Sequence, residues 1–293
     1  MNRVGLALGL LVASLLAASG QITVEVLLDQ DQFLVGESLP VGARITNLSG
    51  QTLRLGGEAD WLTFDIESAR GSVVQKTGDV PVAGEFTLQS SKMATKRVDL
   101  APYFTLTQPG RYYLTATVRI TDWPRTIPPS KQKGFDVIEG AKLWEQEFGI
   151  PVPPGATNTT PEVRKYILQQ ANYLKGQIRL YLRLTDATGS KTFRVFPIGT
   201  LLSFSRPEFQ VDKFSRLHVL YESGPHSFSY SVFSPDGSLL VRQGYDFKTT
   251  RARLRVADDG NISVVGGSRH VTPNDLPPPE TTEGVDDGKT EKP

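Results

Sequence analysis

The sequence predicts an all-β protein, and three observations lead to this class. Apolar and polar residues alternate along most of the chain, turn-forming residues interrupt the alternation at short intervals, and no long stretch has the period of an amphipathic helix. Alternation places successive side chains on opposite faces of a strand, so each stretch indicates a half-buried strand. The chain has 293 residues, 39% of them hydrophobic, which is enough for two domains with a core each.

Residues 1–20 have the layout of a secretory signal peptide. Arg3 precedes an apolar stretch from Val4 to Ala18, and small residues follow it. A membrane anchor is the alternative, but the stretch is shorter than the roughly 20 residues that span a bilayer. We expect cleavage near Ser19 or Gly20 and an exported protein with no later membrane span. The lack of cysteine favours bacterial secretion, to the periplasm or the exterior.

The chain contains no cysteine and only three histidines, His218, His226 and His270. The absence of cysteine excludes disulfides, thiolate metal sites and cysteine nucleophiles, and so few histidines leave little room for zinc or triad chemistry. The sequence also lacks the motifs of α/β-hydrolases, zinc proteases, phosphate loops and dinucleotide-binding sites. We therefore expect no cofactor and no enzymatic activity. A pair of carboxylates suited to glycoside hydrolysis stays open as an alternative.

The sequence predicts a first module over residues 21–139. About seven short strands separated by turns are typical of an antiparallel sandwich, and the clearest strand patterns are Ile22–Val26, Val41–Thr46, Trp61–Ile66 and Tyr112–Ile120. Trp61 is expected in the core of this module. Trp123 precedes a proline, and we place it on a loop, where it either stacks on a sugar or a partner or packs locally.

One stretch of this module resembles a known family. Pro109–Thr117, a proline-glycine turn that leads into an aromatic-rich strand, resembles the late strand of bacterial immunoglobulin-like domains. Asp99–Phe104 and Gly36–Asn47 fit the same family. The resemblance implies an immunoglobulin-like β-sandwich, and some relatives of that kind are similar to proteinase-inhibitor-like sandwiches. The cysteine pair of antibody-type domains is missing, so the likeness concerns architecture.

The composition of residues 140–160 predicts a Pro/Thr-rich connector between the modules. Pro151–Gly155 and the threonine-rich stretch after it have the composition of a semi-rigid spacer. Just before it, Lys142–Phe148 is expected to form a short helix that packs at the junction.

The sequence predicts a β-meander with an internal repeat over residues 161–270. The pattern Arg-Leu-x-aliphatic starts at Arg179, Arg216 and Arg253, at an interval of 37 residues. The interval is close to the roughly 40–45 residues of a propeller blade, and Ser234–Gly237 resembles a blade-type hairpin turn. The module is long enough for only two to three blades, whereas closed propellers use about four to eight. The resemblance therefore implies either a small open arrangement or a homo-oligomer that completes a ring.

The second module is basic, because residues 161–270 carry 16 basic and nine acidic side chains. Strand alternation places basic residues of each repeat on a common face, and equivalent repeats would align them into a row that could hold sulfate, phosphate or carboxylate groups. A solvated strand face is the alternative. Nucleic acid is not expected, since no nucleic-acid motif accompanies the arginines. The candidate ligand residues are the basic residues of these faces and Trp123: Arg179, Arg183, Arg216, His218, Arg253, Arg255 and Trp123.

Residues 271–293 hold six acidic residues and two lysines with few large apolar ones, and we expect a disordered acidic tail. The chain also resembles uncharacterised secreted proteins of Verrucomicrobia-type bacteria, in Leu143–Gly149, Pro161–Gln170 and Ile262–Gly267. We expect an exported, non-enzymatic binding or scaffolding protein whose partner is an unknown protein or an anionic glycan. Two alternatives stay open: a carbohydrate-binding or carbohydrate-processing accessory protein, and a proteinase inhibitor.

Overall fold

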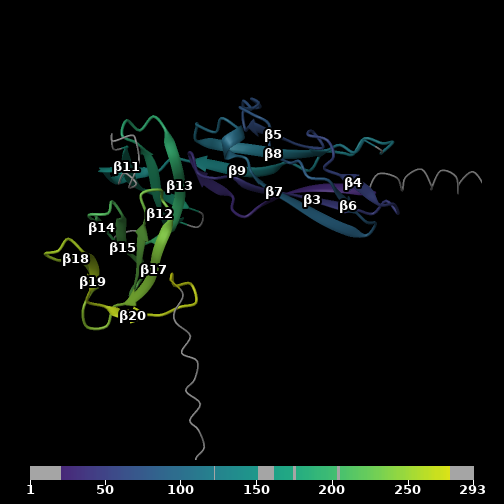
Figure 1. Ribbon diagram of the computed structural model, residues 1–293. Helices are drawn as coiled ribbons and strands as arrows, with labels where there is room; N and C mark the ends of the chain where they lie inside the picture. The colour runs from purple at the N-terminus through teal and green to yellow at the C-terminus, as the bar shows by residue number, and fades with distance from the viewer. Residues whose placement is uncertain (1–20, 122, 151–161, 174–175, 203–204, 278–293) are drawn as a thin grey trace, which may run out of the picture. The chain divides into compact units, whose positions relative to one another are not determined.

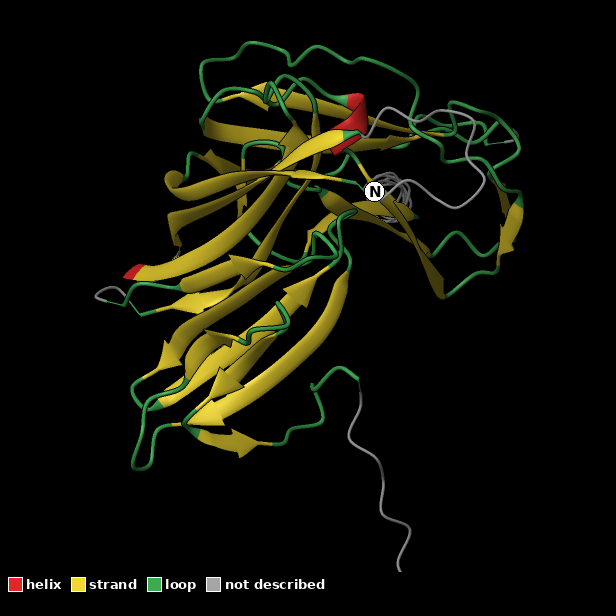
Figure 2. Ribbon diagram, turned by 60° about the vertical axis from the view of Figure 1, so that its left-hand side comes forward, coloured by secondary structure: helices red, strands yellow, loops and turns green. Residues whose placement is uncertain are grey.

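The computed structural model describes residues 21–121, 123–150, 162–173, 176–202 and 205–277 (Figure 1). This part of the chain is all-β and has no α-helix, as the strand colouring of Figure 2 shows. A short 3-10 turn, η1, covers Ala101–Tyr103. The chain divides into two compact units, residues 1–140 (unit 1) and 141–293 (unit 2). The predicted signal peptide lies outside the described residues.

Unit 1 consists of two main sheets and a short strand pair. The first sheet has the order β1-β3-β7, the second β2-β9-β8-β5, and the pair is β4-β6; all neighbours are antiparallel except β2 and β9. The strands are β1 (Ile22–Leu28), β2 (Gln32–Leu34), β3 (Pro40–Asn47), β4 (Leu53–Leu55), β5 (Leu62–Ser68), β6 (Phe86–Leu88), β7 (Lys92–Asp99), β8 (Gly110–Val118) and β9 (Lys133–Ile138).

Alternate residues of these strands form one core between the two sheets. Ala43 and Ile45 of the first sheet and Ile66 and Leu114 of the second are all fully buried. Because side chains alternate along a strand, the intervening residues point away from this core, and most of them are half-buried. Trp61 is 2% exposed, which confirms its predicted place in the core.

Unit 2 consists of two larger sheets and a separate hairpin. The first sheet has the order β10-β11-β12-β13, the second β14-β15-β16-β17-β20, and the hairpin is β18-β19; every neighbouring pair is antiparallel. The strands are β10 (Ala141–Gly149), β11 (Val163–Tyr173), β12 (Gln177–Asp186), β13 (Thr192–Leu201), β14 (Glu208–Val211), β15 (Leu217–Gly224), β16 (Ser227–Phe233), β17 (Leu239–Asp246), β18 (Arg253–Val256), β19 (Ile262–Val265) and β20 (Ser268–His270).

The two large sheets and the hairpin are three layers of unit 2. Leu182 and Leu184 of the first sheet share a core with Leu217 and Val219 of the second. The opposite face of the second sheet packs under the hairpin, where Leu220, Phe228, Tyr230 and Val232 meet Leu254 and Val264. The consecutive strands β10–β13 and β14–β17 each form a four-stranded meander with the up-and-down order of a β-propeller blade, and β20 adds a fifth strand beside β17. The two meanders follow one another along the chain as blades do.

The 37-residue repeat matches one hairpin in each large sheet. A shift of 37 positions aligns the sequence of β12-β13 with that of β15-β16. In this alignment Leu180 corresponds to the buried Leu217, and Phe196 corresponds to Phe233. The match stops there, because β12 is the third strand of its sheet and β15 is the second strand of the next. The third copy forms only the two-stranded hairpin β18-β19. The repeating structural unit of the two large sheets is therefore a four-stranded meander, not the 37-residue unit of the sequence pattern.

The predicted helix over Lys142–Phe148 is wrong, because these residues form strand β10 in unit 2. Its two aromatic residues are four positions apart, a spacing that places both on one side of a helix and also on one face of a strand. Trp144 packs on Phe209 with ring centres 4.5 Å apart, and Phe148 on Tyr166 with centres 4.0 Å apart. Pairing with β11 therefore decides the conformation. Residues 151–160 of the predicted connector lie outside the described residues.

The first part of the predicted disordered tail, residues 271–277, is ordered against unit 2. Arg242 and Leu276 exchange backbone hydrogen bonds of 2.9 Å in both directions. Asp275 is buried and binds the guanidinium of Arg269 and the hydroxyl of Thr272. This ion pair and backbone pairing supply the contacts that the low hydrophobicity of the segment does not indicate. Residues 278–293 lie outside the described part.

Candidate functional site

The expected row of arginines does not form. Arg179 lies on β12 of the first sheet of unit 2, Arg216 precedes β15 of the second sheet, and Arg253 begins the separate hairpin. The row required equivalent repeats in equivalent places, and the repeats occupy different positions in their sheets. Each basic residue therefore has its own surroundings.

The two arginines of β12 make contacts within their own sheet. The guanidinium of Arg179 lies 3.4 Å from the ring centre of Tyr173. Nε of Arg183 donates a hydrogen bond of 3.0 Å to the side-chain oxygen of Gln169, and burial lowers the pKa of Arg183. Both side chains therefore support the β11-β12 pair.

Arg216 and His218 belong to a network around the buried carboxylate of Asp212. Nε of Arg216 donates a hydrogen bond of 2.6 Å to one carboxylate oxygen, and Nε2 of His218 lies 3.2 Å from the same oxygen. The second oxygen accepts from the backbone N–H groups of Phe214 and Arg216. Nδ1 of His218 lies 2.7 Å from the hydroxyl of Tyr230, and burial lowers the pKa of this histidine. The network closes the β14-β15 turn, so His218 is not on an open ligand face.

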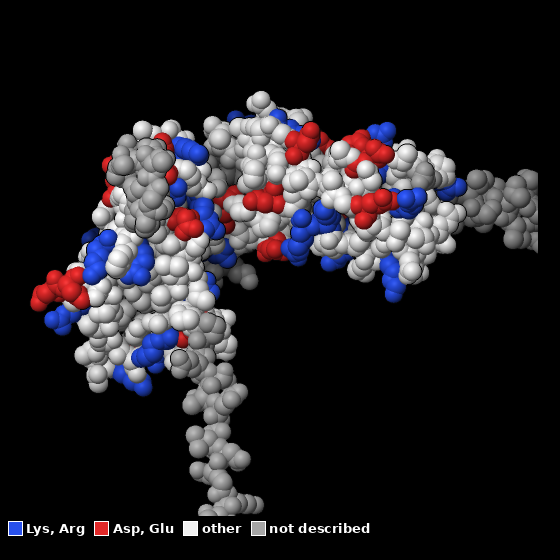
Figure 3. Space-filling model, viewed as in Figure 1, with Lys and Arg blue, Asp and Glu red and all other residues white. Residues whose placement is uncertain are grey.

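Three arginines do meet at one place in unit 2, where the start of β14, the end of β15 and the start of β18 come together. They surround a hollow of about 460 Å³ that opens to solvent. Figure 3 shows Lys and Arg side chains over unit 2 with Asp and Glu side chains among them. We call this place the arginine hollow, and its lining residues are Ser205, Arg206, Pro207, Glu208, Glu222, Arg251 and Arg253.

Two glutamates hold two of these arginines. One carboxylate oxygen of Glu208 accepts a hydrogen bond of 2.8 Å from Nη1 of Arg253, and the other accepts one of 2.8 Å from the backbone N–H of Leu254. Glu222 accepts a hydrogen bond of 3.2 Å from Nη2 of Arg251. The side chain of Glu222 is 12% exposed and that of Arg251 is 40% exposed. The carboxylates thus lie deeper than the guanidiniums that they orient.

The third arginine, Arg206, has no hydrogen-bond or ion-pair partner within the part of the chain that the structure describes. The hollow therefore has three guanidiniums against two carboxylates, and its excess positive charge is at Arg206. A guanidinium presents a planar fork of N–H donors that fits carboxylate, sulfate and phosphate groups. The chemistry available here is the binding of such an anion.

General acid–base chemistry is a poorer match for the hollow. Both oxygens of Glu208 already accept hydrogen bonds, and Glu222 is engaged by Arg251. A general acid must carry a proton that it can donate. Among the described residues, no group of three or more histidine, aspartate or glutamate side chains is placed to hold a metal ion.

The sequence points to part of this site. Arg253 is among the predicted residues. Arg251 is two positions before it, and alternation of side chains places both on the same face of an extended chain. Arg255 continues that alternation but does not line the hollow. Glu208, Glu222 and Arg206 carry no signal in the sequence, because only the packing of β14 beside β18 brings them to the hairpin. Trp123 is a residue of unit 1, where it packs half-buried against the core.

Comparison with known proteins gives no family for this chain: neither a family model nor a curated protein sequence matches it. None of the helical segments in the described residues is long and apolar enough to cross a membrane.

Proposed function

We propose that the protein is an exported, non-enzymatic binding protein whose unit 2 holds an anionic group of a partner protein or glycan in the arginine hollow. The observation that carries the proposal is the placement of three guanidiniums around one open hollow, two of them oriented by glutamates and one with no partner among the described residues. The two glutamates reduce the side-chain entropy that is lost on ligand binding, since they already hold two of the three arginine side chains.

Two features of the sequence support export and the bacterial envelope or exterior as the place of action. The first is the signal-peptide layout of residues 1–20. The second is the likeness to secreted proteins of Verrucomicrobia-type bacteria. An immunoglobulin-like class for unit 1 is part of the proposal, supported by two sheets around one core and by the stretch Pro109–Thr117.

Arg206 gives the cleanest test, because its replacement leaves no carboxylate without a partner. We expect Arg206→Ser to weaken the binding of a heparin hexasaccharide about tenfold, equivalent to about 1.4 kcal/mol, as measured by isothermal titration calorimetry at fixed salt. Arg206→Lys, which keeps the charge and loses the fork, should lie between Arg206→Ser and the wild type.

Arg255→Ser is the matched control, since Arg255 is an exposed arginine on β18 that does not line the hollow. Its affinity should stay within twofold of the wild type. Equal losses in Arg206→Ser and Arg255→Ser would show that only the overall charge matters. That result, or no loss in Arg206→Ser, would overturn the proposed site.

A further inference from the structure

We infer that unit 1 carries a second binding surface, centred on Trp123, for an oligosaccharide chain with carboxylate-bearing rings. The surface is separate from the arginine hollow and does not depend on it. Three neighbouring hollows at one end of the β5-β8 pair make it up, and each shares lining residues with the next; we call this row of hollows the strip.

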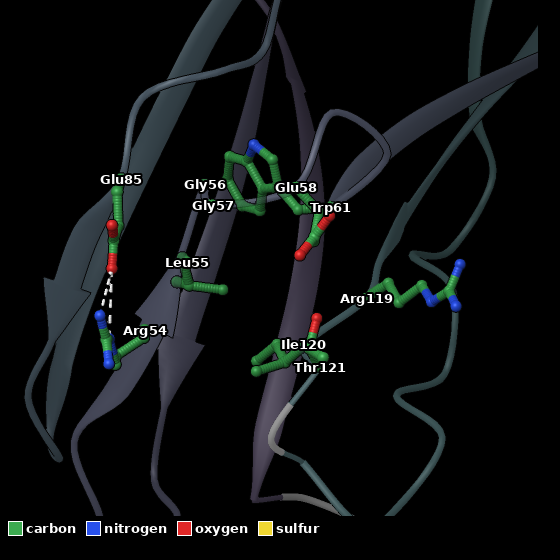
Figure 4. Close-up of a pocket in the computed structure, with 10 residues that line it drawn as sticks. All are labelled: Arg54, Leu55, Gly56, Gly57, Glu58, Trp61, Glu85, Arg119, Ile120 and Thr121. Carbon is green, nitrogen blue, oxygen red and sulfur yellow. Dashed lines mark hydrogen bonds and ion pairs between the residues drawn. The ribbon is translucent and has the colours of Figure 1, made fainter.

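The first hollow, of about 210 Å³, lies between the Arg54–Glu85 ion pair on one side and Arg119 on the other (Figure 4). The segment Arg119–Thr121 also lines the second hollow, of about 520 Å³. Trp123 and Arg125–Ile127 line both the second hollow and a third, of about 150 Å³, which Gln21 and Ile22 also line. A strip of several open hollows suits a chain of rings better than a single small molecule.

Trp123 and Trp61 differ in what they offer to a ligand. Trp61 is buried, and its indole N–H donates a hydrogen bond of 2.9 Å to the carbonyl of Val82. Trp123 is half-buried, and its indole N–H has no acceptor among the described residues. An indole that packs on the core yet keeps surface and a free donor can stack on the C–H face of a sugar and bind a hydroxyl.

The charges along the strip indicate where an acidic ring would bind. Arg119 is paired with Asp60 through a contact of 2.8 Å, and Arg54 is paired with Glu85. Arg125 is exposed and has no hydrogen-bond or ion-pair partner in the described part of the chain. The unpaired cation therefore lies in the two hollows that Trp123 lines, where it can bind the carboxylate of a ring stacked on the indole. The hollow of Figure 4, which contains Glu58 and Glu85, suits a neutral ring.

The test measures where a hexagalacturonate probe binds and how tightly. Bound probe should protect tryptophan fluorescence from acrylamide quenching, and that protection should be lost in Trp123→Phe, which keeps an aromatic ring against the core. By calorimetry, Arg125→Ser should bind the probe at least fivefold more weakly than the wild type. Arg70→Ser is the matched control, because Arg70 is exposed, lies in unit 1 and lines none of the three hollows. Its affinity should be unchanged.

Each outcome decides between sites. Binding that survives in Trp123→Phe and Arg125→Ser but is lost in Arg206→Ser would place the probe in the arginine hollow and overturn this inference while keeping the proposed function. Equal losses in Arg125→Ser and Arg70→Ser would also overturn it, as would tight binding of a proline-rich peptide with no binding of the oligosaccharide. Binding of neutral maltohexaose as tight as that of hexagalacturonate would refute the role given to Arg125.

Discussion

Replacement of Tyr166 by phenylalanine tests how the two large sheets of unit 2 are joined. Tyr166 lies on β11 of the first sheet and is fully buried. Its hydroxyl lies 3.0 Å from the carbonyl oxygen of Ser215 and 2.9 Å from that of Ser234. These carbonyls belong to the β14-β15 and β16-β17 turns, so one hydroxyl connects the first sheet to two turns of the second. Burial raises the pKa of this hydroxyl above its ordinary value, and it remains a donor.

Tyr166→Phe keeps the ring that stacks on Phe148 and removes only the hydroxyl. The Ser234 carbonyl also accepts a hydrogen bond of 2.8 Å from the backbone N–H of Gly237, so it keeps a donor when the hydroxyl is removed, whereas the half-buried Ser215 carbonyl loses the hydroxyl as a donor. The net contribution of such a hydrogen bond is about 1 kcal/mol, which we expect as the decrease in the free energy of unfolding in equilibrium urea titrations followed by circular dichroism.

Tyr173→Phe is the control, since the ring under Arg179 stays in place and no described residue hydrogen-bonds to the hydroxyl of Tyr173. Its free energy of unfolding should stay within about 0.5 kcal/mol of the wild type. The reasoning fails if Tyr166→Phe is as stable as Tyr173→Phe.

Two further predictions concern a turn in unit 1 and the pH dependence of unit 2. Gly56 has φ +84°, and a Cβ there would lie 2.1 Å from the carbonyl oxygen of Gly84. Gly56→Ala should therefore destabilise unit 1 by more than about 1 kcal/mol in the same titration. Gly57→Ala, with no atom within 4 Å of its Cβ, should be near neutral, and equal effects of the two substitutions would contradict the argument. Burial lowers the pKa of His218 below the ordinary 6.5, against the opposite effect of the Asp212 carboxylate. As the pH falls through about 6.5, the unfolded chain therefore takes up a proton first, and the stability present above that pH is lost by at most about 1.4 kcal/mol per pH unit. Thermal melting between pH 7 and pH 5 should show this slope, and His218→Asn should flatten it; an unchanged slope would refute the assignment.

The strand class and the core of unit 1 follow directly from the sequence, because alternation is a local signal. Val41, Ala43 and Ile45 are fully buried, and they alternate with Gly42, Arg44 and Thr46. The aromatic pair Trp144 and Phe148 fits a helix and a strand equally well in spacing, and only β11 resolves the choice. Local periodicity therefore predicts which residues are buried better than it predicts the element that buries them.

The candidate site is less accessible to sequence reasoning for a physical reason. Arg253 belongs to the predicted set, but the partners that make it part of a site, Glu208 and Glu222, come from strands whose pairing is set by packing between layers. The tetrapeptide that repeats at Arg179, Arg216 and Arg253 falls at different places in three sheets. A repeat in the sequence fixes a strand pattern, and it does not fix the neighbours of that strand.

The middle sheet of unit 2 has consequences for how the protein is made. One of its faces is covered by strands that come earlier in the chain, and the other by the hairpin β18-β19, which comes later. A chain that emerges from the amino-terminal end therefore leaves Leu220, Phe228, Tyr230 and Val232 exposed to water until residue 265 has appeared. Ribosome-bound or translocating intermediates that stop between β17 and β19 expose a hydrophobic sheet face. At this stage of synthesis the nascent protein most needs protection from aggregation.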